Sequence, residues 1–137
     1  IKSIYQNLFN NYQFSRLKLL AITLQNFKKV KDLPVMYSLL TDEDQKSNNY
    51  KKGDTEGFVN FGLSIEGIQL SVLMIEKKEE GVVKLSFRSK GDVSVNDFAA
   101  NFFNGGGHIH AAGGVSHLSL AETEEKFLTD ILTHLKS

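Results

Sequence analysis

A run of three glycines at positions 105–107 constrains this chain more than any other feature of its sequence. The run opens the segment Gly105-Gly106-Gly107-His108-Ile109-His110-Ala111-Ala112-Gly113. Glycine has no Cβ, so it tolerates positive φ and close backbone approach, at a cost of about 0.5–1 kcal/mol per residue relative to alanine. Converging backbone N–H groups bind anions. The run therefore predicts a loop that an anion can approach closely, although glycine also follows helix ends for purely structural reasons.

A helix is expected immediately before the glycines. The segment 94–103 has apolar residues at helical spacing, and Ser94 is placed as its N-cap. We also expect a short helix from His108 to Ala112. The N–H groups and the dipole at its start would favour an anion beside the His108 side chain.

The composition indicates one globular domain. The chain has 137 residues, of which 41% are hydrophobic and 23% charged, enough for one core. The absence of cysteine excludes disulfides and cysteine-bound zinc, and no apolar run approaches the roughly 18 residues of a membrane span. We therefore expect a cytoplasmic protein with no membrane partner. Sixteen basic and sixteen acidic residues give zero net charge, which suits a short substrate better than long duplex DNA.

The hydrophobic spacing predicts an α/β fold: a single domain with a mixed sheet of about four to five strands flanked by helices, preceded by a linker helix. We assign residues 1–13 to the end of an interdomain linker and 14–137 to the domain. The first domain helix should bury a stripe of residues at helical spacing. The stripe comprises Phe14, Leu17, Leu20, Ala21, Leu24 and Phe27. The remaining predicted elements are strands at 35–40, 70–75 and 82–88, a helix from Asp54 or Thr55 to Leu63, and a C-terminal helix whose capping box is Ser119…Glu122.

Arg88 ends a strand in which apolar and polar residues alternate, so it lies on the polar face. Its planar group can bind phosphate through two parallel hydrogen bonds, which lysine cannot do. A surface salt bridge is the alternative role. Ser89 either adds a hydroxyl donor or simply ends the strand.

Three motifs occur in a fixed order: Gly53-Asp54-Thr55-Glu56-Gly57-Phe58-Val59-Asn60, then Ser86-Phe87-Arg88-Ser89, then Gly-Gly-Gly-His at 105–108 with Ala-Ala-Gly at 111–113. The set resembles the substrate-binding C-terminal domain of the DHH phosphoesterase superfamily. The first motif, followed by Leu63-Ser64-Ile65-Glu66-Gly67, resembles the branch of nanoRNases and adenosine-bisphosphate (pAp) phosphatases, which are exopolyphosphatase-related and RecJ-like.

The resemblance implies which residues bind the substrate phosphate. They are Arg88, Ser89, Gly105, Gly106, Gly107 and His108, with His110, Thr55 and Glu56 as further contacts. Thr55 and Glu56 are equally explained as helix-start residues. A zinc site at His108 and His110 is the alternative for the two histidines, but two ligands fall short of the three or four that zinc takes.

The resemblance also implies what this chain lacks. The family's metal-binding carboxylates and Asp-His-His signature belong to a separate N-terminal DHH domain, and no Asp-His-His occurs here. We therefore expect no catalytic residue and no metal ligand in this chain, with Mn²⁺ (or Mg²⁺) bound by that other domain. The first residue, Ile1, fits an excised domain. The isolated chain is predicted to be inactive.

The function implied for the intact protein is hydrolysis of short oligoribonucleotides, from either end, and of 3′,5′-bisphosphonucleotides. The expected partners are short single-stranded RNA or a nucleotide phosphate, the DHH domain of the same chain, and a second copy if the protein forms a homodimer. One alternative keeps the fold and changes the substrate to polyphosphate or a cyclic dinucleotide. Another, of a different class, is a noncatalytic RNA-binding module, as in alanyl-tRNA synthetase.

Overall fold

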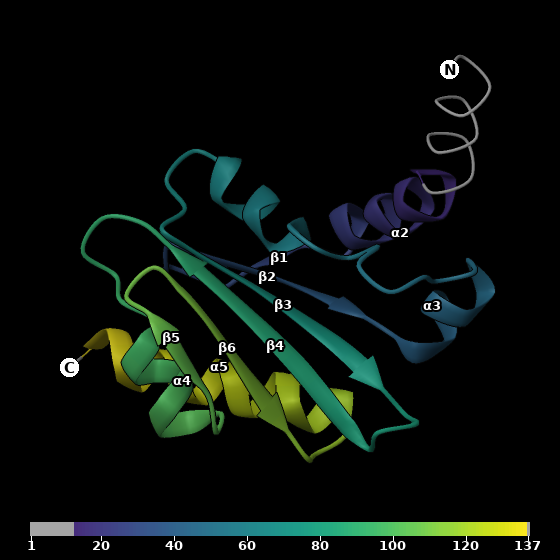
Figure 1. Ribbon diagram of the computed structural model, residues 1–137. Coiled ribbons are helices and arrows are strands. Elements are labelled where there is room, and N and C mark those ends of the chain that lie inside the picture. Colours follow the sequence, from purple (N-terminus) through teal and green to yellow (C-terminus); the bar gives the residue numbers. More distant parts are fainter. Residues whose placement is uncertain (1–12, 137) are drawn as a thin grey trace.

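The computed structural model describes residues 13–136, which form one six-stranded mixed sheet with helices on both faces (Figure 1). The strand order is β1-β2-β3-β4-β6-β5; β2 and β3 are parallel and every other neighbouring pair is antiparallel. The α/β class and the mixed sheet are confirmed, with six strands where about four to five were expected. The elements are α2 (Gln13–Gln25), β1 (Lys28–Lys29), β2 (Val35–Leu40), α3 (Asp42–Ser47), the 3₁₀ helix η2 (Phe58–Ser64), β3 (Leu70–Lys77), β4 (Val82–Ser89), α4 (Asn96–Phe102), β5 (Gly106–His108), β6 (Ala111–Ser116) and α5 (Leu120–Lys136).

One face of the sheet is covered by α4 and α5, which pack over a core rich in phenylalanine. Phe98 of α4 lies at its centre, with its ring edge-on to Phe87 of β4 and to Phe127 of α5. All three side chains have no exposed surface. Val83, Leu85 and Phe87 face this core, as the alternation along β4 predicts.

The other face is covered only in part, because α2 and η2 pack over β2 and β3. A second, smaller core lies there, formed by Leu19, Leu40, Phe58, Val59, Leu73 and Ile75. On this side, β4, β6 and β5 carry exposed or half-buried residues. We call this surface the open face; its residues are Lys84, Ser86, Arg88, Ala111, Gly113, Val115, Gly106 and His108. Figure 1 shows it with α5 passing behind the strands.

The predicted buried stripe of α2 is wrong. Phe14, Leu17 and Leu24 are 59%, 57% and 46% exposed. The helix instead buries Leu19 together with two hydroxyl residues, Ser15 and Thr23, whose oxygens find hydrogen-bond partners. Apolar residues occur around much of this helix, so their spacing alone does not select the face that packs. The linker assigned to 1–13 lies outside the described residues except for Gln13, which begins α2.

Two further helix predictions are wrong. Residues 54–57 form turns, and η2 begins only at Phe58, after Gly57 at φ +83°. Residues 108–112 form the tight end of the β5–β6 hairpin, in which His108 pairs with Ala111, and β6 also pairs with β4. Ser94 is not the cap of α4, which follows Val95 without a side-chain cap.

The C-terminal capping box is confirmed: the Glu122 amide donates to Ser119 Oγ at 3.1 Å, and the Ser119 amide donates to Glu122 Oε1 at 3.2 Å. The structure also contains four elements that the hydrophobic pattern did not reveal, namely β1, β5, β6 and α3. None of the described helices is long and apolar enough to cross a membrane.

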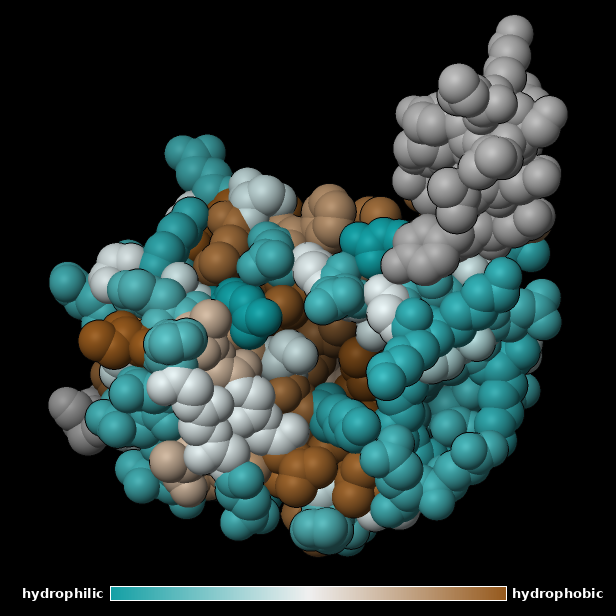
Figure 2. Space-filling model, in the orientation of Figure 1, coloured by the Kyte–Doolittle hydropathy of each residue, from teal (hydrophilic) through white to brown (hydrophobic). Residues whose placement is uncertain are grey.

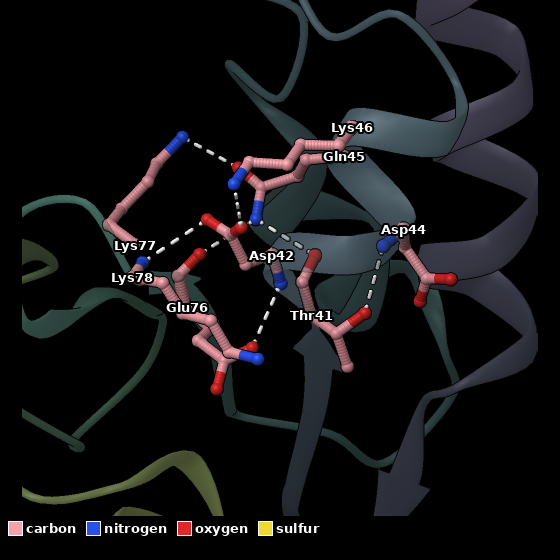
Figure 3. A network of polar contacts seen from close by, with 8 residues as sticks. All are labelled: Thr41, Asp42, Asp44, Gln45, Lys46, Glu76, Lys77 and Lys78. Atoms are coloured by element: carbon pink, nitrogen blue, oxygen red, sulfur yellow. Dashed lines mark hydrogen bonds and ion pairs between the residues drawn. The ribbon is translucent and has the colours of Figure 1, made fainter.

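Helix α3 is held to β3 by a polar network centred on Asp42 (Figure 3). Lys46 Nζ lies 3.0 Å from Asp42 Oδ2, the Lys78 amide donates to Asp42 Oδ1 at 3.1 Å, and the Asp42 amide donates to Glu76 Oε1 at 3.0 Å. The hydrogen bond from Lys46 lowers the pKa of Asp42 more than burial raises it. The network therefore stabilises the ionised carboxylate.

Candidate functional site

Arg88 lies on the open face because β4 places alternate side chains on opposite sides of the sheet. Its Nη1 donates to the carbonyl oxygen of Phe87 at 2.9 Å and lies 3.5 Å from that of Ala112. No carboxylate among residues 13–136 pairs with it. The surface salt bridge that was the alternative role for Arg88 is therefore not formed within the described chain, and Arg88 keeps donors for a ligand.

The strand register brings Arg88 and His108 to the same face. Arg88 pairs with Ala111 on β6, and Ala111 pairs with His108 on β5. Directly opposed residues of paired strands point to the same side of the sheet. Arg88, Ala111 and His108 therefore form one row across three strands, with the arginine and the exposed histidine two strand spacings apart, about 9–10 Å.

The next row of the open face has almost no side chains. Ser86 pairs with Gly113, and Gly113 pairs with Gly106. A methyl group added at Gly106 would meet no heavy atom within 4 Å. Beside the Arg88–His108 row the surface is thus a backbone floor without side chains at Gly106 and Gly113. The glycine run was predicted to be a loop, but its last two glycines belong to strand β5.

The other two glycines of the run serve the fold. A Cβ at Gly105 would lie 1.9 Å from the carbonyl oxygen of Gly113, and one at Gly107 would lie 2.6 Å from that of Ala111. Gly107 also has φ +148°. Glycine is therefore needed at both positions for this segment to lie against β6.

Ser89 and His110 are not brought to the side of Arg88. Ser89 follows Arg88 on β4, so it points to the opposite face and is buried. Its Oγ lies 3.0 Å from His110 Nδ1, and its amide donates to the His110 carbonyl oxygen at 3.0 Å. These two residues fasten the hairpin turn to β4.

Thr55 and Glu56 do come close to Arg88. The loop 52–57 and the edge of the open face enclose a pocket of about 420 Å³. Figure 2 looks onto this side of the molecule and shows a hollow with an apolar floor near its centre. The pocket is lined by Lys52, Gly53, Thr55, Glu56, Gly57, Val59, Leu73, Ile75, Ser86 and Arg88. Its polar rim and apolar floor suit a ligand with both charged and flat apolar parts.

A larger cavity of about 550 Å³ lies beside Asp42 and Lys77, and it shares only Lys52 with the Arg88 pocket. Two of its lysines are paired with carboxylates, Lys46 with Asp42 and Lys84 with Glu80. It contains none of the residues predicted for the site.

Two contributors were missed by reasoning from the sequence. Ser86 could have been found, because it precedes Arg88 by two residues on the same strand face. Arg16 could not, because it reaches the 54–56 loop across 38 to 40 residues of sequence. Among the described residues there is no group of three His, Cys, Asp or Glu side chains that could hold a metal ion.

Comparison with known proteins identifies the family. Residues 19–137 match the model of the DHHA1 domain. The chain is 39% identical over 83 residues to the bifunctional oligoribonuclease and PAP phosphatase NrnA of Thermus thermophilus, an alignment that covers 60% of this chain and 25% of that protein.

Solved structures agree. An exopolyphosphatase-related protein from Bacteroides fragilis superposes with a TM-score of 0.85 at 39% identity, over 97% of this chain and 38% of that one. A pGpG-specific phosphodiesterase from Vibrio cholerae shares the fold, with a TM-score of 0.64 at 14% identity, over 90% of this chain and 41% of that one. The chain spans well under half the length of each of these relatives. It belongs to the DHHA1 domain family, the C-terminal domain of the DHH phosphoesterase superfamily.

Proposed function

We propose that this chain is the substrate-binding domain of a phosphoesterase that hydrolyses short oligoribonucleotides and 3′,5′-bisphosphonucleotides. The observation that carries the proposal is the row of Arg88, Ala111 and His108 beside the Gly106–Gly113 floor. A guanidinium and an imidazole on one face, with a surface free of side chains next to them, suit a phosphate and its attached sugar. The relative from Thermus thermophilus, whose name states these two activities, supports the choice of substrate.

Each residue has a distinct part in the proposed binding. Arg88 donates to nonbridging phosphate oxygens, and His108 donates from the far side of the row. Gly106 lets the ligand lie against the backbone. Thr55 and Glu56 contact the part of the ligand that enters the pocket, where Val59 and Leu73 provide apolar surface. Ser89 and His110 act by holding the hairpin turn in place.

The metal belongs to another part of the intact protein in this proposal. The described residues offer no ligand cluster, so they do not fit Mn²⁺ or Mg²⁺. We assign the metal to an N-terminal DHH domain that faces the open face; when bound there, it would supply activation of the attacking water. The isolated chain then binds nucleotides but does not hydrolyse them. The intact protein is proposed to act in the cytoplasm.

A substrate panel tests the proposal. The full-length protein is assayed with Mn²⁺ or Mg²⁺ against a diribonucleotide, adenosine 3′,5′-bisphosphate, polyphosphate and a cyclic dinucleotide. Turnover of the first two is the expected result. Turnover of polyphosphate or the cyclic dinucleotide alone would transfer the protein to the alternative substrate class, and RNA binding without any turnover would make it a noncatalytic module.

A further inference from the structure

Arg16 of α2 holds the loop that forms one wall of the Arg88 pocket. Its Nη1 donates to the carbonyl oxygens of Asp54 and Glu56, each at 2.9 Å. Its guanidinium lies 4.7 Å over the centroid of the Phe58 ring. Among the described residues no carboxylate pairs with Arg16. The charged group is thus committed to the backbone of this loop.

The residue before Arg16 grips the same loop. Ser15 Oγ donates to Asp54 Oδ2 at 2.8 Å, and the Lys51 amide donates to the same oxygen at 3.0 Å. Asp54 has no exposed surface, and its Oδ1 has no hydrogen-bond partner in the described part of the chain. A buried carboxylate with one unpartnered oxygen is costly, so the hydrogen bond from Ser15 helps to keep Asp54 in place while Arg16 holds the backbone of the same loop.

The loop has little structure of its own. Residues 52–57 form turns rather than a helix or strand, and Gly53 and Gly57 adopt φ of +92° and +83°. Thr55 and Glu56 line the pocket that also contains Arg88. Their distance from Arg88 is therefore set by where α2 holds the loop.

We propose that Arg16 is a positioning residue for substrate binding: it fixes the Thr55–Glu56 wall opposite Arg88 without touching the substrate. The inference rests on the proposed function for the identity of the ligand. The mechanical role of Arg16, which is to hold the loop, does not depend on the identity of the ligand. The two can therefore be tested separately.

Hydrogen exchange tests the mechanical role on the domain without ligand. The amides of Glu56 and Phe58 donate to Gly53 and Thr55 carbonyl oxygens inside the loop, so they exchange when the loop opens. Arg16→Met should speed their exchange by about 10-fold or more. Lys18→Met is the matched control, because Lys18 is exposed on the same helix, stacks on Phe14 and has the same charge. It should leave both amides unchanged.

Kinetics of the full-length protein test the link to binding. Arg16→Met should raise KM for adenosine 3′,5′-bisphosphate by about 10-fold while kcat stays within about twofold. Arg16→Lys should recover part of the loss, because an ammonium group can donate to both carbonyl oxygens but cannot stack flat on Phe58. Arg16→Lys also provides the test if Arg16→Met does not fold.

Unchanged loop exchange in Arg16→Met, or equal effects in Lys18→Met, would overturn the inference. So would a fall in kcat with normal loop exchange, which would make Arg16 a substrate contact. If the wild-type protein hydrolyses none of the nucleotides, the proposed function fails, and the exchange experiment still decides whether Arg16 holds the loop.

Discussion

The two faces of β4 differ in what their side chains are for. Phe87 and Arg88 are neighbours in sequence but point to opposite sides of the sheet. Phe87 has no exposed surface and touches the rings of Phe98 and Phe103. Arg88 is half-buried, lies on the open face and has no carboxylate partner among residues 13–136. One face of the strand holds the fold together, and the other carries the exposed and half-buried polar groups that we propose bind the ligand.

The glycine run divides in the same way. Gly105 and Gly107 leave no room for a methyl group, whereas Gly106 faces open space. A single motif thus contains residues required for packing and a residue whose small size has no structural cause in the described chain. Such a residue is the better candidate for a role in binding.

The largest effect on stability is expected on the covered face. Phe87→Ala should lower the free energy of unfolding by about 3–5 kcal/mol, because it removes a fully buried ring from the centre of the core. Denaturant unfolding monitored by circular dichroism measures it. A loss below about 1 kcal/mol would mean that the two faces are less distinct than we describe.

The neighbouring substitution should affect activity instead. Arg88→Ala should lower kcat/KM of the full-length protein for adenosine 3′,5′-bisphosphate by about 10–100-fold, through loss of charge-assisted hydrogen bonds to phosphate. The free energy of unfolding should fall by less than about 1 kcal/mol. Lys84→Ala, on the same face of β4, is the control and should leave kcat/KM within about twofold. Equal kcat/KM for Arg88→Ala and wild type would assign Arg88 to the surface.

The glycine pair sharpens the comparison within one motif. Gly106→Ala should cost less than about 1 kcal/mol of stability and lower kcat/KM by about 10-fold, because the methyl group occupies space that the ligand needs. Gly105→Ala should destabilise the domain by about 1–3 kcal/mol, since its Cβ would overlap the Gly113 carbonyl oxygen. Kinetics and unfolding on the same preparations separate the two. Full activity in Gly106→Ala would mean that the surface formed by Gly106 and Gly113 has no role in binding.

The smallest effect is expected at Asp42, which belongs to neither face of the β4–β6 region. Its pKa is lowered in the folded state, so its contribution is present above the unfolded pKa of about 4 and is lost as pH falls through the folded value. Asp42→Asn should therefore lower the free energy of unfolding by less than about 1 kcal/mol at pH 7, and by less still near pH 3. Urea unfolding of wild type and Asp42→Asn at pH 7 and pH 3 tests this direction. A larger loss of stability at pH 3 than at pH 7 would contradict it.

Much of the fold could be predicted from the sequence wherever a local pattern of residues was compatible with only one structure. The alternation in β4 gave both its burial and the side on which Arg88 lies. The Ser119…Glu122 capping box marked the start of α5, because both of its hydrogen bonds are local. The hairpin of β5 and β6 was not predictable in this way, since a strand made of glycine and histidine has no hydrophobic period.

Helix α2 was predicted as an element, but its buried face was not. The stripe of Phe14, Leu17 and Leu24 has helical spacing, yet these residues are exposed. Ser15 is buried in their place because Asp54, far along the chain, accepts its hydroxyl hydrogen. Hydrogen-bond partners supplied by distant segments change which side of a helix packs, and the helix's own sequence does not encode them.

The sequence by itself determined the family, the α/β class and the residue types suited to binding phosphate, because these depend on motifs and on local periodicity. Only the tertiary structure decided which of those residues meet. The register of β4, β6 and β5 placed Arg88 and His108 on the same face of the sheet, whereas Ser89 and His110 contact each other away from Arg88. The packing of α2 placed Thr55 and Glu56 beside Arg88. Strand register and helix docking are set by contacts between residues distant in sequence, and a local pattern carries no record of them.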